Sequence, residues 1–510
     1  MFFNHHKFMN QHQNRSLTTT EIKSYLVTVV FVLVTILVVA IATLYPFKFS
    51  LPNSFSEFDF FSSFNNASSF QDQVNNVLLF MPLGFSLANL LQKLKIKIGL
   101  QIIIVLLVSA GLSSTVEVLQ IFLPSRTPTP ADIFNNTFGG YLGFLCFYFW
   151  NIQSLNNIVT QIEASTLRPS NKKITGLILA YFSVILLACI FWQSTTILSN
   201  WDLNYPLILG NESTGNRPWQ GYISEVYITD KAITTEQAQT GFNDANYFRG
   251  FGDSLLANYQ LNGKCCDQKQ TVNLPQLLWQ GKPTNIGEGK GVFLSSSQWL
   301  QTAKPVKNLS QRISKKSEFT LSATIATDNL QQTGPARIIS ISGNSLQRNL
   351  TLSQQGHSLD LRLRTPITGE NGSDLQMIIP NVFIDNKFHQ IIITYYKSTI
   401  KVFIDKVQRY YSFNLLELIP FNQKIFYYAL TFIPLGAGLS FLSFFTKNSV
   451  TFSKLLVPSG ILLPSIILEA ILIGESDKSL SWKNLLLGIL FTAGTMLIFR
   501  MRVAYLKIRS

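Results

Sequence analysis

The chain has 510 residues, with 41 lysines and arginines against 27 aspartates and glutamates, and a formal net charge of +14. Apolar residues make up 47 % of it and charged residues only 13 %, and the mean hydropathy is +0.22. This composition excludes a disordered chain and an ordinary cytosolic enzyme.

Long apolar stretches predict eight membrane spans, because about 20 residues at 1.5 Å per residue cross a hydrocarbon core of about 30 Å. In chain order they are residues 25–44, 74–91, 98–122, 133–150, 174–198, 425–445, 455–473 and 484–499. The first four form one bundle at 25–150, and the last three follow a soluble domain at 200–418. An arm at 1–24, a loop at 151–173 and a tail at 500–510 complete the chain. The prediction is a polytopic α-helical membrane protein with one inserted soluble domain.

The distribution of positive charge predicts the orientation of these spans. Fifteen lysines and arginines lie in the arm, the tail and the loops 92–97, 151–173 and 446–454, against five in the opposite loops and span ends. Cytoplasmic loops are enriched in Lys and Arg. Both termini are therefore expected in the cytoplasm, residues 200–418 outside, and the chain in the plasma (inner) membrane. Because topology accounts for most of the charge, no nucleic-acid partner is expected.

The second span begins a pattern that recurs near the C-terminus. Phe80–Gly84 (FMPLG) returns as Phe432–Gly436 (FIPLG), and Glu117 and Glu469 follow the two prolines by the same interval, since 117 − 82 = 469 − 434 = 35. A serine lies four residues before each glutamate, at Ser113 and Ser465. The later segment also has Asn484 and Gly488, which correspond to Asn136 and Gly140 or to Asn135 and Gly139. We expect a parallel four-plus-four duplication. Residues 425–499 would be a degenerate scaffold copy of 74–150, without the glutamine, arginine and aspartate of the first.

Polar residues gather where the third span ends and the fourth begins. Glu117 lies about five residues before the end of its span, hence roughly 7–8 Å deep, and an intramembrane carboxylate costs at least about 2.5 kcal/mol unless it meets partners or water. The candidate binding residues around it are Asn76, Gln120, Arg126, Asn135 and Asn136, and Asp132 is a second candidate acid or base. The alternative is a structural hydrogen-bond network between helices.

The same residues carry a family resemblance over roughly residues 25–150. The motifs are Asn76-x-x-x-Phe80-x-Pro82-x-Gly84, Glu117-x-x-Gln120, and Arg126 followed by Asp132-x-x-x-Asn136 and Gly139. In this order they resemble the VanZ-like family of small bacterial membrane proteins. The resemblance implies a cell-envelope protein, and the founding member of the family is linked to low-level resistance to glycopeptide antibiotics. It implies no particular reaction.

Residues 200–418 alternate short apolar strands with turn residues, which predicts an antiparallel β-sandwich. The clearest strands are residues 318–323, 336–341, 359–363, 389–395 and 400–405. The domain resembles laminin-G and concanavalin A-like jelly rolls, on the residues Phe388-His389 and Val402–Asp405. A pattern at Ile223–Ile228 that normally closes such folds opens this one, so the order looks circularly permuted. The resemblance implies a glycan or protein ligand. Calcium at Asp253, Asn262 and Asp267 and the redox state of Cys265 and Cys266 stay open.

Three functions remain possible at this point. In the first, the membrane cluster engages a polar or anionic headgroup of a lipid or lipid-linked envelope precursor, and the sandwich engages an external glycan or protein. In the second, the chain is an enzyme on such a precursor, with Glu117 as general base, Asp132 as its partner and Arg126 as anion clamp. In the third it is a structural adaptor. No metal site is expected, because no histidine lies near the cluster, and the sequence identifies no cofactor or oligomeric state.

Overall fold

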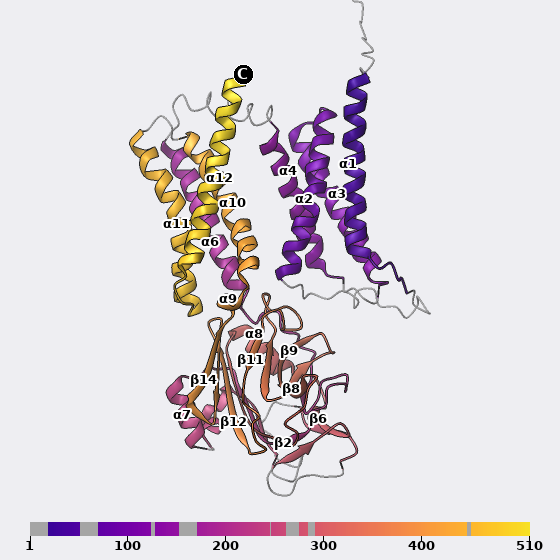
Figure 1. The fold of residues 1–510 in the computed structure, drawn as a ribbon, viewed down its shortest axis with the longest axis vertical. Helices are drawn as coiled ribbons and strands as arrows, with labels where there is room; N and C mark the ends of the chain where they lie inside the picture. The colour runs from indigo at the N-terminus through magenta and orange to yellow at the C-terminus, as the bar shows by residue number, and fades with distance from the viewer. Residues whose placement is uncertain are drawn as a thin grey trace, which may run out of the picture. The chain divides into compact units, whose positions relative to one another are not determined.

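The computed structural model describes residues 19–50, 70–123, 128–151, 171–244, 246–261, 275–283, 291–445 and 450–509. The chain divides into two compact units, of residues 1–65 with 73–155 and of residues 66–72 with 156–510, and each is taken by itself (Figure 1). Most of the predicted arm at 1–24 and of the loop at 151–173 lies outside the described residues. Arg126, Asn262, Cys265, Cys266 and Asp267 also lie outside them.

The first unit consists of helices that agree with the first four predicted spans. They are α1 (Thr19–Leu44), α2 (Phe70–Lys93), α3 (Ile98–Gln120) and α4 (Pro130–Trp150). Phe80, Leu83, Val105 and Phe144 are buried in a shared core, whereas apolar residues such as Leu107 point outward. Helices that are apolar on both sides are typical of a membrane bundle.

Seven of the described helices are long and apolar enough to cross a membrane, so the chain is a multi-pass membrane protein. They are α1, α2, α3, α6 (Asn171–Ser194), α10 (Phe421–Phe445), α11 (Val450–Ser476) and α12 (Trp482–Arg509). Helix α4 is not among them, because Asp132, Asn135 and Asn136 lie in its first two turns. Its 21 residues nevertheless span about 30 Å. The predicted total of eight spans is therefore reached only if α4 is counted with the seven.

Glycines bring α4 against its neighbours. A Cβ added to Gly139 would lie 2.3 Å from the carbonyl oxygen of Val77, and one on Gly143 would lie 1.9 Å from that of Met81. A Cβ on Gly140 would lie 2.1 Å from Oγ of Ser109 on α3. Small residues permit such close backbone approach between membrane helices. These glycines of α4 therefore determine where its first turns lie relative to α3.

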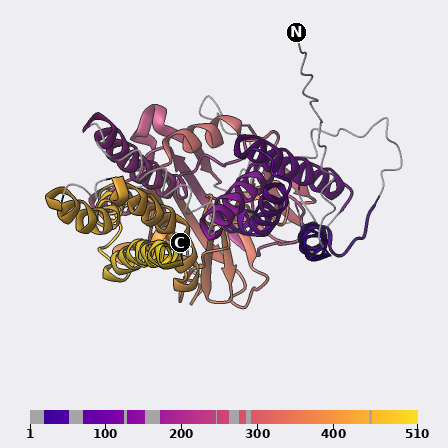
Figure 2. The same cartoon turned by 90° about the horizontal axis from the view of Figure 1, so that it is seen from above.

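The second unit contains a second bundle. Helix α10 packs against α12, α11 and α6, and Figure 2 shows this group nearly end-on. Helix α12 runs to Arg509, so the tail predicted at 500–510 continues the last helix. Val503 in this extension is buried.

The inserted domain has two antiparallel sheets of seven strands each. In spatial order the first sheet contains β11 (Met377–Ile379), β10 (Ser358–Leu363), β9 (Arg348–Gln355), β8 (Ala336–Ser342), β1 (Leu207–Leu209), β6 (Gln298–Thr302) and β4 (Leu277–Gly281). The second contains β14 (Lys406–Asn414), β13 (Thr399–Ile404), β12 (His389–Tyr396), β7 (Phe319–Thr327), β2 (Gly221–Thr229) and β3 (Leu255–Gln260), with β5 (Val292–Leu294) paired to β2. Short helices α7 (Thr235–Asn243), η2 (Tyr247–Ser254) and α8 (Lys307–Lys316) lie between strands, and α9 (Leu415–Leu418) lies between β14 and α10.

All five strands named from the sequence are confirmed. Along β10, buried Leu359, Leu361 and Leu363 alternate with half-buried polar residues, which is the period-two pattern that predicted the strand. The predicted strand at 400–405 ends one residue early, because Asp405 has a positive φ of 60° and turns the chain. The laminin-G-like kinship and the circular permutation stay predictions.

The chain enters and leaves the sandwich at one place, the turn between β12 and β13. Oγ1 of Thr196, just after α6, lies 2.7 Å from Oγ of Ser398, and the amide of Leu415, at the start of α9, donates to the Ser398 carbonyl at 2.9 Å. Adjacent ends suit an insertion between two membrane helices. The sandwich also holds the last carbonyls of α11, since Lys397 Nζ donates to Gly474 O at 3.0 Å and Asn414 Nδ2 to Ser476 O at 2.7 Å.

Candidate functional site

The buried side of α3 is polar at regular intervals. Gln101, Ser109, Ser113 and Glu117 are all buried and lie four or eight residues apart, so they share one side of the helix. Polar side chains in a membrane helix usually face the bundle interior. This polar stripe leads to the end where α3 stops and α4 starts.

Glu117 is only 2 % exposed. Its Oε2 accepts a hydrogen bond of 2.8 Å from the backbone amide of Thr129, the residue that precedes α4. Pro130 at the first position of α4 has no amide hydrogen, and the amide of the preceding Thr129 supplies this donor. Asp132, in the first turn of α4, is close enough to interact electrostatically with Glu117. The two predicted acids therefore lie within electrostatic range of each other.

Asn136, one turn further along α4, reaches the same stripe. Its Nδ2 donates to Oγ of Ser113 at 2.8 Å, which ties α4 to α3 one turn below Glu117. Oδ1 of Asn136 and Oγ1 of Thr129 are buried and have no hydrogen-bond partner among the described residues. A buried polar group without a partner costs free energy. The site therefore presents a carboxylate, an amide oxygen and a hydroxyl that suit a ligand with hydrogen-bond donors.

The other predicted site residues divide into two groups. Gln120 is buried but donates from Nε2 to the carbonyl of Thr43 at 3.0 Å, so it joins α3 to α1 and does not face Glu117. Asn76 and Asn135 are half-buried on α2 and α4. Arg126 lies outside the described residues. The structure thus brings together Glu117, Asp132 and Asn136 of the predicted set.

The second bundle contains a polar site that sequence reasoning overlooked. Glu469 of α11 accepts a hydrogen bond of 3.0 Å from Tyr428 Oη at Oε1, and Lys478 Nζ lies 2.5 Å from Oε2. Both charged side chains are 2 % exposed. The supposed scaffold copy therefore has a buried ion pair. The signal was present, because Lys478 follows Arg126 by the same 352 residues that separate Glu469 from Glu117.

Two of the expected correspondences between the bundles need correction. Asn136 donates to Oγ of Ser113. Oγ of Ser465 donates to the Leu485 carbonyl at 2.9 Å, and it would lie 2.5 Å from a Cβ added to Gly488, 352 positions after Asn136. A Cβ on Gly84 would lie 1.8 Å from the carbonyl oxygen of Gly140, and one on Gly436 would lie 2.6 Å from that of Thr492, again 352 positions later. At a separation of 352 residues, the expected match of Asn136 with Asn484 is offset by four residues, one helical turn. Similar residues on the same side of a helix caused the shift.

A third polar cluster lies in the sandwich, around His389 of β12. Nδ1 of its ring lies 2.7 Å from Oδ2 of Asp405, and Nε2 lies 3.1 Å from Oδ1 of Asp385. The hydrogen bond with Asp405, and then the remaining contacts with both carboxylates, raise the pKa of His389 above its ordinary 6.5, although burial opposes this. Arg409 at 3.7 Å from Asp405 and Lys387 at 3.9 Å from Asp385 are the neighbouring cations.

We expect this cluster to make the sandwich less stable as the pH rises. A raised folded-state pKa adds stability that is fully present below the unfolded pKa of about 6.5 and is lost as the pH passes through the folded value. The melting temperature of the full chain should therefore fall between pH 6 and pH 9 by more than that of His389→Gln. His357→Gln, a histidine bonded to the Phe383 carbonyl, should keep the wild-type slope. Equal slopes for wild type and His389→Gln would contradict the assignment.

Within the described ranges, no group of three or more His, Cys, Asp or Glu side chains is placed to hold a metal ion.

Comparison with known proteins gives one match. Residues 9–151 match the family model described as VanZ/LLP1, which covers the first bundle and less than a third of the chain. No curated protein and no solved structure matches significantly. The match contains every site residue predicted from the sequence.

Proposed function

From the premise that the first bundle is of the VanZ/LLP1 type, we propose that this chain is a cell-envelope membrane protein that binds a polar headgroup. The ligand is a membrane lipid or a lipid-linked envelope precursor, held between α3 and α4. The sandwich then contacts a glycan or protein outside the cell. By the charge of its loops, both termini are cytoplasmic and the sandwich is extracytoplasmic.

One observation carries the headgroup proposal. Buried Glu117 lies beside Asp132, and two buried polar atoms near it, Asn136 Oδ1 and Thr129 Oγ1, have no partner among the described residues. A network that served only to tie helices together would be satisfied internally. Hydroxyl or ammonium groups of a headgroup supply the donors that these oxygens lack.

The two bundles support a parallel duplication, and with it a role for Arg126. The pairs Asn76 and Tyr428, Glu117 and Glu469, and Arg126 and Lys478 are each separated by 352 residues. In the second bundle the later residues of these pairs are in contact, because Glu469 accepts hydrogen bonds from both Tyr428 and Lys478. By analogy, we propose that Arg126 pairs with Glu117 or with the anionic part of a headgroup. The first bundle differs in having Asn136 where the second has Gly488, which marks the first as the binding copy.

The experiment is lipid retention by the purified full-length chain. Native mass spectrometry after extraction counts the phosphatidylglycerol or phosphatidylethanolamine molecules that stay bound, whose headgroups carry hydroxyl and ammonium donors respectively. Glu117→Gln and Asn136→Leu should each reduce retention at least tenfold, because each removes an oxygen that accepts from the ligand. Glu475→Gln, an exposed glutamate in the last turns of α11, makes the same charge change and should leave retention unchanged.

Three outcomes separate the alternatives. Equal retention in all variants contradicts the headgroup site. Loss of expression and monodispersity in Glu117→Gln, with no loss of lipid from the folded fraction, favours the structural adaptor. Conversion of a labelled lipid-linked cell-wall precursor by wild type and not by Glu117→Gln or Asp132→Asn favours the enzyme, which the electrostatic interaction between these two carboxylates makes worth testing.

A further inference from the structure

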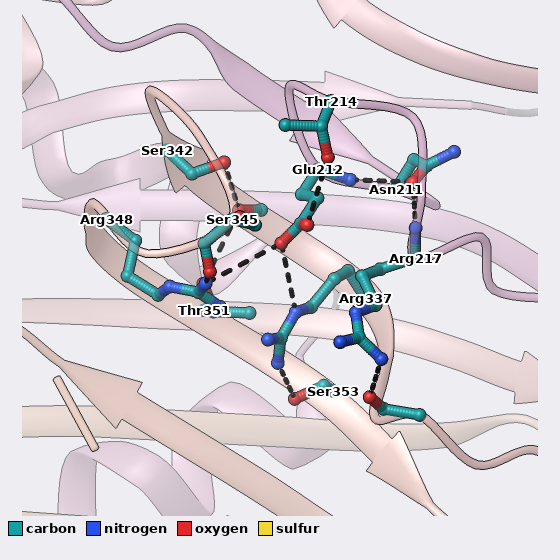
Figure 3. Close-up of polar contacts among 12 residues, drawn as sticks. Asn211, Glu212, Thr214, Arg217, Arg337, Ser342, Ser345, Arg348, Thr351 and Ser353 are labelled. Carbon is teal, nitrogen blue, oxygen red and sulfur yellow. Dashed lines mark hydrogen bonds and ion pairs between the residues drawn. The ribbon is translucent and has the colours of Figure 1, made fainter. Parts of the chain in front are cut away.

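One face of the first sheet of the sandwich is lined with polar side chains and is nonetheless buried. Ser340 of β8 pairs with Thr351 of β9, and their hydroxyls lie 3.4 Å apart. Arg337 Nη1 donates to Oγ of Ser353 at 3.0 Å. The loop 211–218, between β1 and β2, lies over these strands (Figure 3). All four residues are at most 2 % exposed.

Two guanidinium groups on this face share one carboxylate from the loop. Glu212 Oε2 lies 3.5 Å from Arg337 Nε and 3.7 Å from Arg348 Nη2. Charge-assisted N–H···O bonds are ordinarily about 2.7–2.9 Å, so the carboxylate is held loosely. Oε2 of Glu212, Nε of Arg337, and both Nε and Nη1 of Arg348 have no hydrogen-bond partner in the part of the chain that the structure describes.

Two carboxylates, Glu212 and Asp360, face three guanidinium groups here, since Asp360 Oδ2 lies 3.8 Å from Arg337 Nη1 and 3.1 Å from Arg362 Nε. Burial, followed by the positive charge of Arg337, lowers the pKa of Arg348 to about 9. Burial, followed by the charge of Arg362, likewise lowers the pKa of Arg337 to about 10. Desolvated guanidinium groups with unused donors favour a well-placed anion. A planar carboxylate that accepts two parallel bonds fits an arginine fork.

The loop that supplies Glu212 is a turn closed on itself. Asn211 Oδ1 accepts from the amides of Glu212 and Arg217 at 2.9 and 3.0 Å, and Thr214 Oγ1 donates to Glu212 Oε1 at 3.1 Å. The tip, Thr214 with its neighbours Asn216 and Arg217, is exposed. Beneath the tip, a Cβ on Gly215 would lie 3.7 Å from the ring of half-buried Trp299. The tip therefore covers the Trp299 ring and is bonded to β8, since the amide of Arg337 donates to the Arg217 carbonyl at 3.0 Å, and a ligand has to displace this cover.

We propose that this face is a covered binding site for a uronic-acid-bearing glycan, in which Glu212 is the internal occupant of the Arg337–Arg348 pair. The site rests on the glycan binding proposed above for the sandwich and specifies its ligand. The sugar carboxylate takes the place of Glu212 and uses the free arginine donors. The hydroxyls of Ser340 and Thr351 meet sugar hydroxyls, and the indole of Trp299 offers a stacking surface.

The test measures binding of tetragalacturonate by the full-length chain in nanodiscs, with calorimetry and with a neutral galactose tetramer as the paired probe. Glu212→Gln removes the competing carboxylate and should raise affinity for tetragalacturonate at least tenfold, without effect on the neutral tetramer. A gain of binding cannot come from misfolding. Glu225→Gln, a half-buried glutamate of β2 in the other sheet, should bind like wild type.

A second variant and a second measurement complete the design. Arg348→Lys in the Glu212→Gln background should abolish the gain, because an ammonium group cannot form the paired bonds. Tetragalacturonate should raise the melting temperature of Glu212→Gln more than that of wild type. If wild type and all variants bind it equally, glycan binding by the sandwich stands and this site is wrong. If neither wild type nor Glu212→Gln binds it, the site is overturned.

Discussion

Lys478→Met is expected to destabilise the second bundle by about 3–5 kcal/mol, because it leaves the Glu469 carboxylate buried without its cation. The lysine and glutamate side chains are each 2 % exposed and their charged atoms lie 2.5 Å apart. Tyr428 remains as the single described donor to Glu469, and a neutral hydroxyl does not replace an ammonium group. Equilibrium unfolding of the full chain in mixed detergent micelles, followed by tryptophan fluorescence, measures the loss.

Two controls identify the cause of this loss. Adding Glu469→Gln to Lys478→Met removes the unpaired charge and should restore most of the stability, because a buried pair is often replaceable by neutral groups. Lys483→Met changes an exposed lysine five residues away and should stay within about 0.5 kcal/mol of wild type. A single variant as stable as the double variant would show that the ion pair does not stabilise the bundle.

Gly143→Leu should have a comparable effect in the first bundle. A Cβ at this position would lie 1.9 Å from the backbone oxygen of Met81, and a backbone atom cannot move aside as the end of a side chain can. Overpacking of this kind costs about 3 kcal/mol, and α4 must separate from α2 to relieve it. The displacement also moves Asn136 away from Ser113. We therefore expect lower resistance to detergent unfolding together with loss of bound lipid.

The matched control is Gly111→Leu on α3. Nothing lies within 4 Å of a Cβ added to Gly111, so the same substitution adds an outward-facing leucine to a membrane helix and should be neutral or slightly stabilising. If Gly111→Leu is as harmful as Gly143→Leu, helix–helix contact is not the cause. If both are harmless, the close approach of α2 and α4 is wrong.

Local patterns were sufficient to predict most of the elements. Apolar length identified the spans, because a helix in lipid must be apolar over about 20 residues. Period-two alternation identified strands such as β10, because neighbouring side chains of a strand face opposite sides. The approach of Glu117 to Asp132 was also predictable, since both lie at the ends of helices joined by a short connection. These signals lie within one helix or strand, or between neighbours in the sequence.

Which residues of the two bundles correspond could not be predicted from the sequence. Asn136 and Asn484 look alike, but contacts place Gly488 opposite Ser465. A helix repeats its environment every turn, so an alignment of apolar segments is easily shifted by four residues. Only the packed helices decide the register.

The sequence by itself determined that the chain is a multi-pass membrane protein with an inserted β-domain, because hydropathy and strand periodicity are properties of consecutive residues. The tertiary structure alone decided which charges meet. Gln120 donates to the α1 backbone and does not face Glu117, Lys478 neutralises Glu469, and Glu212 lies between two arginines more than 120 residues away in the chain. Such pairings depend on distances through space, which the order of residues along the chain does not specify.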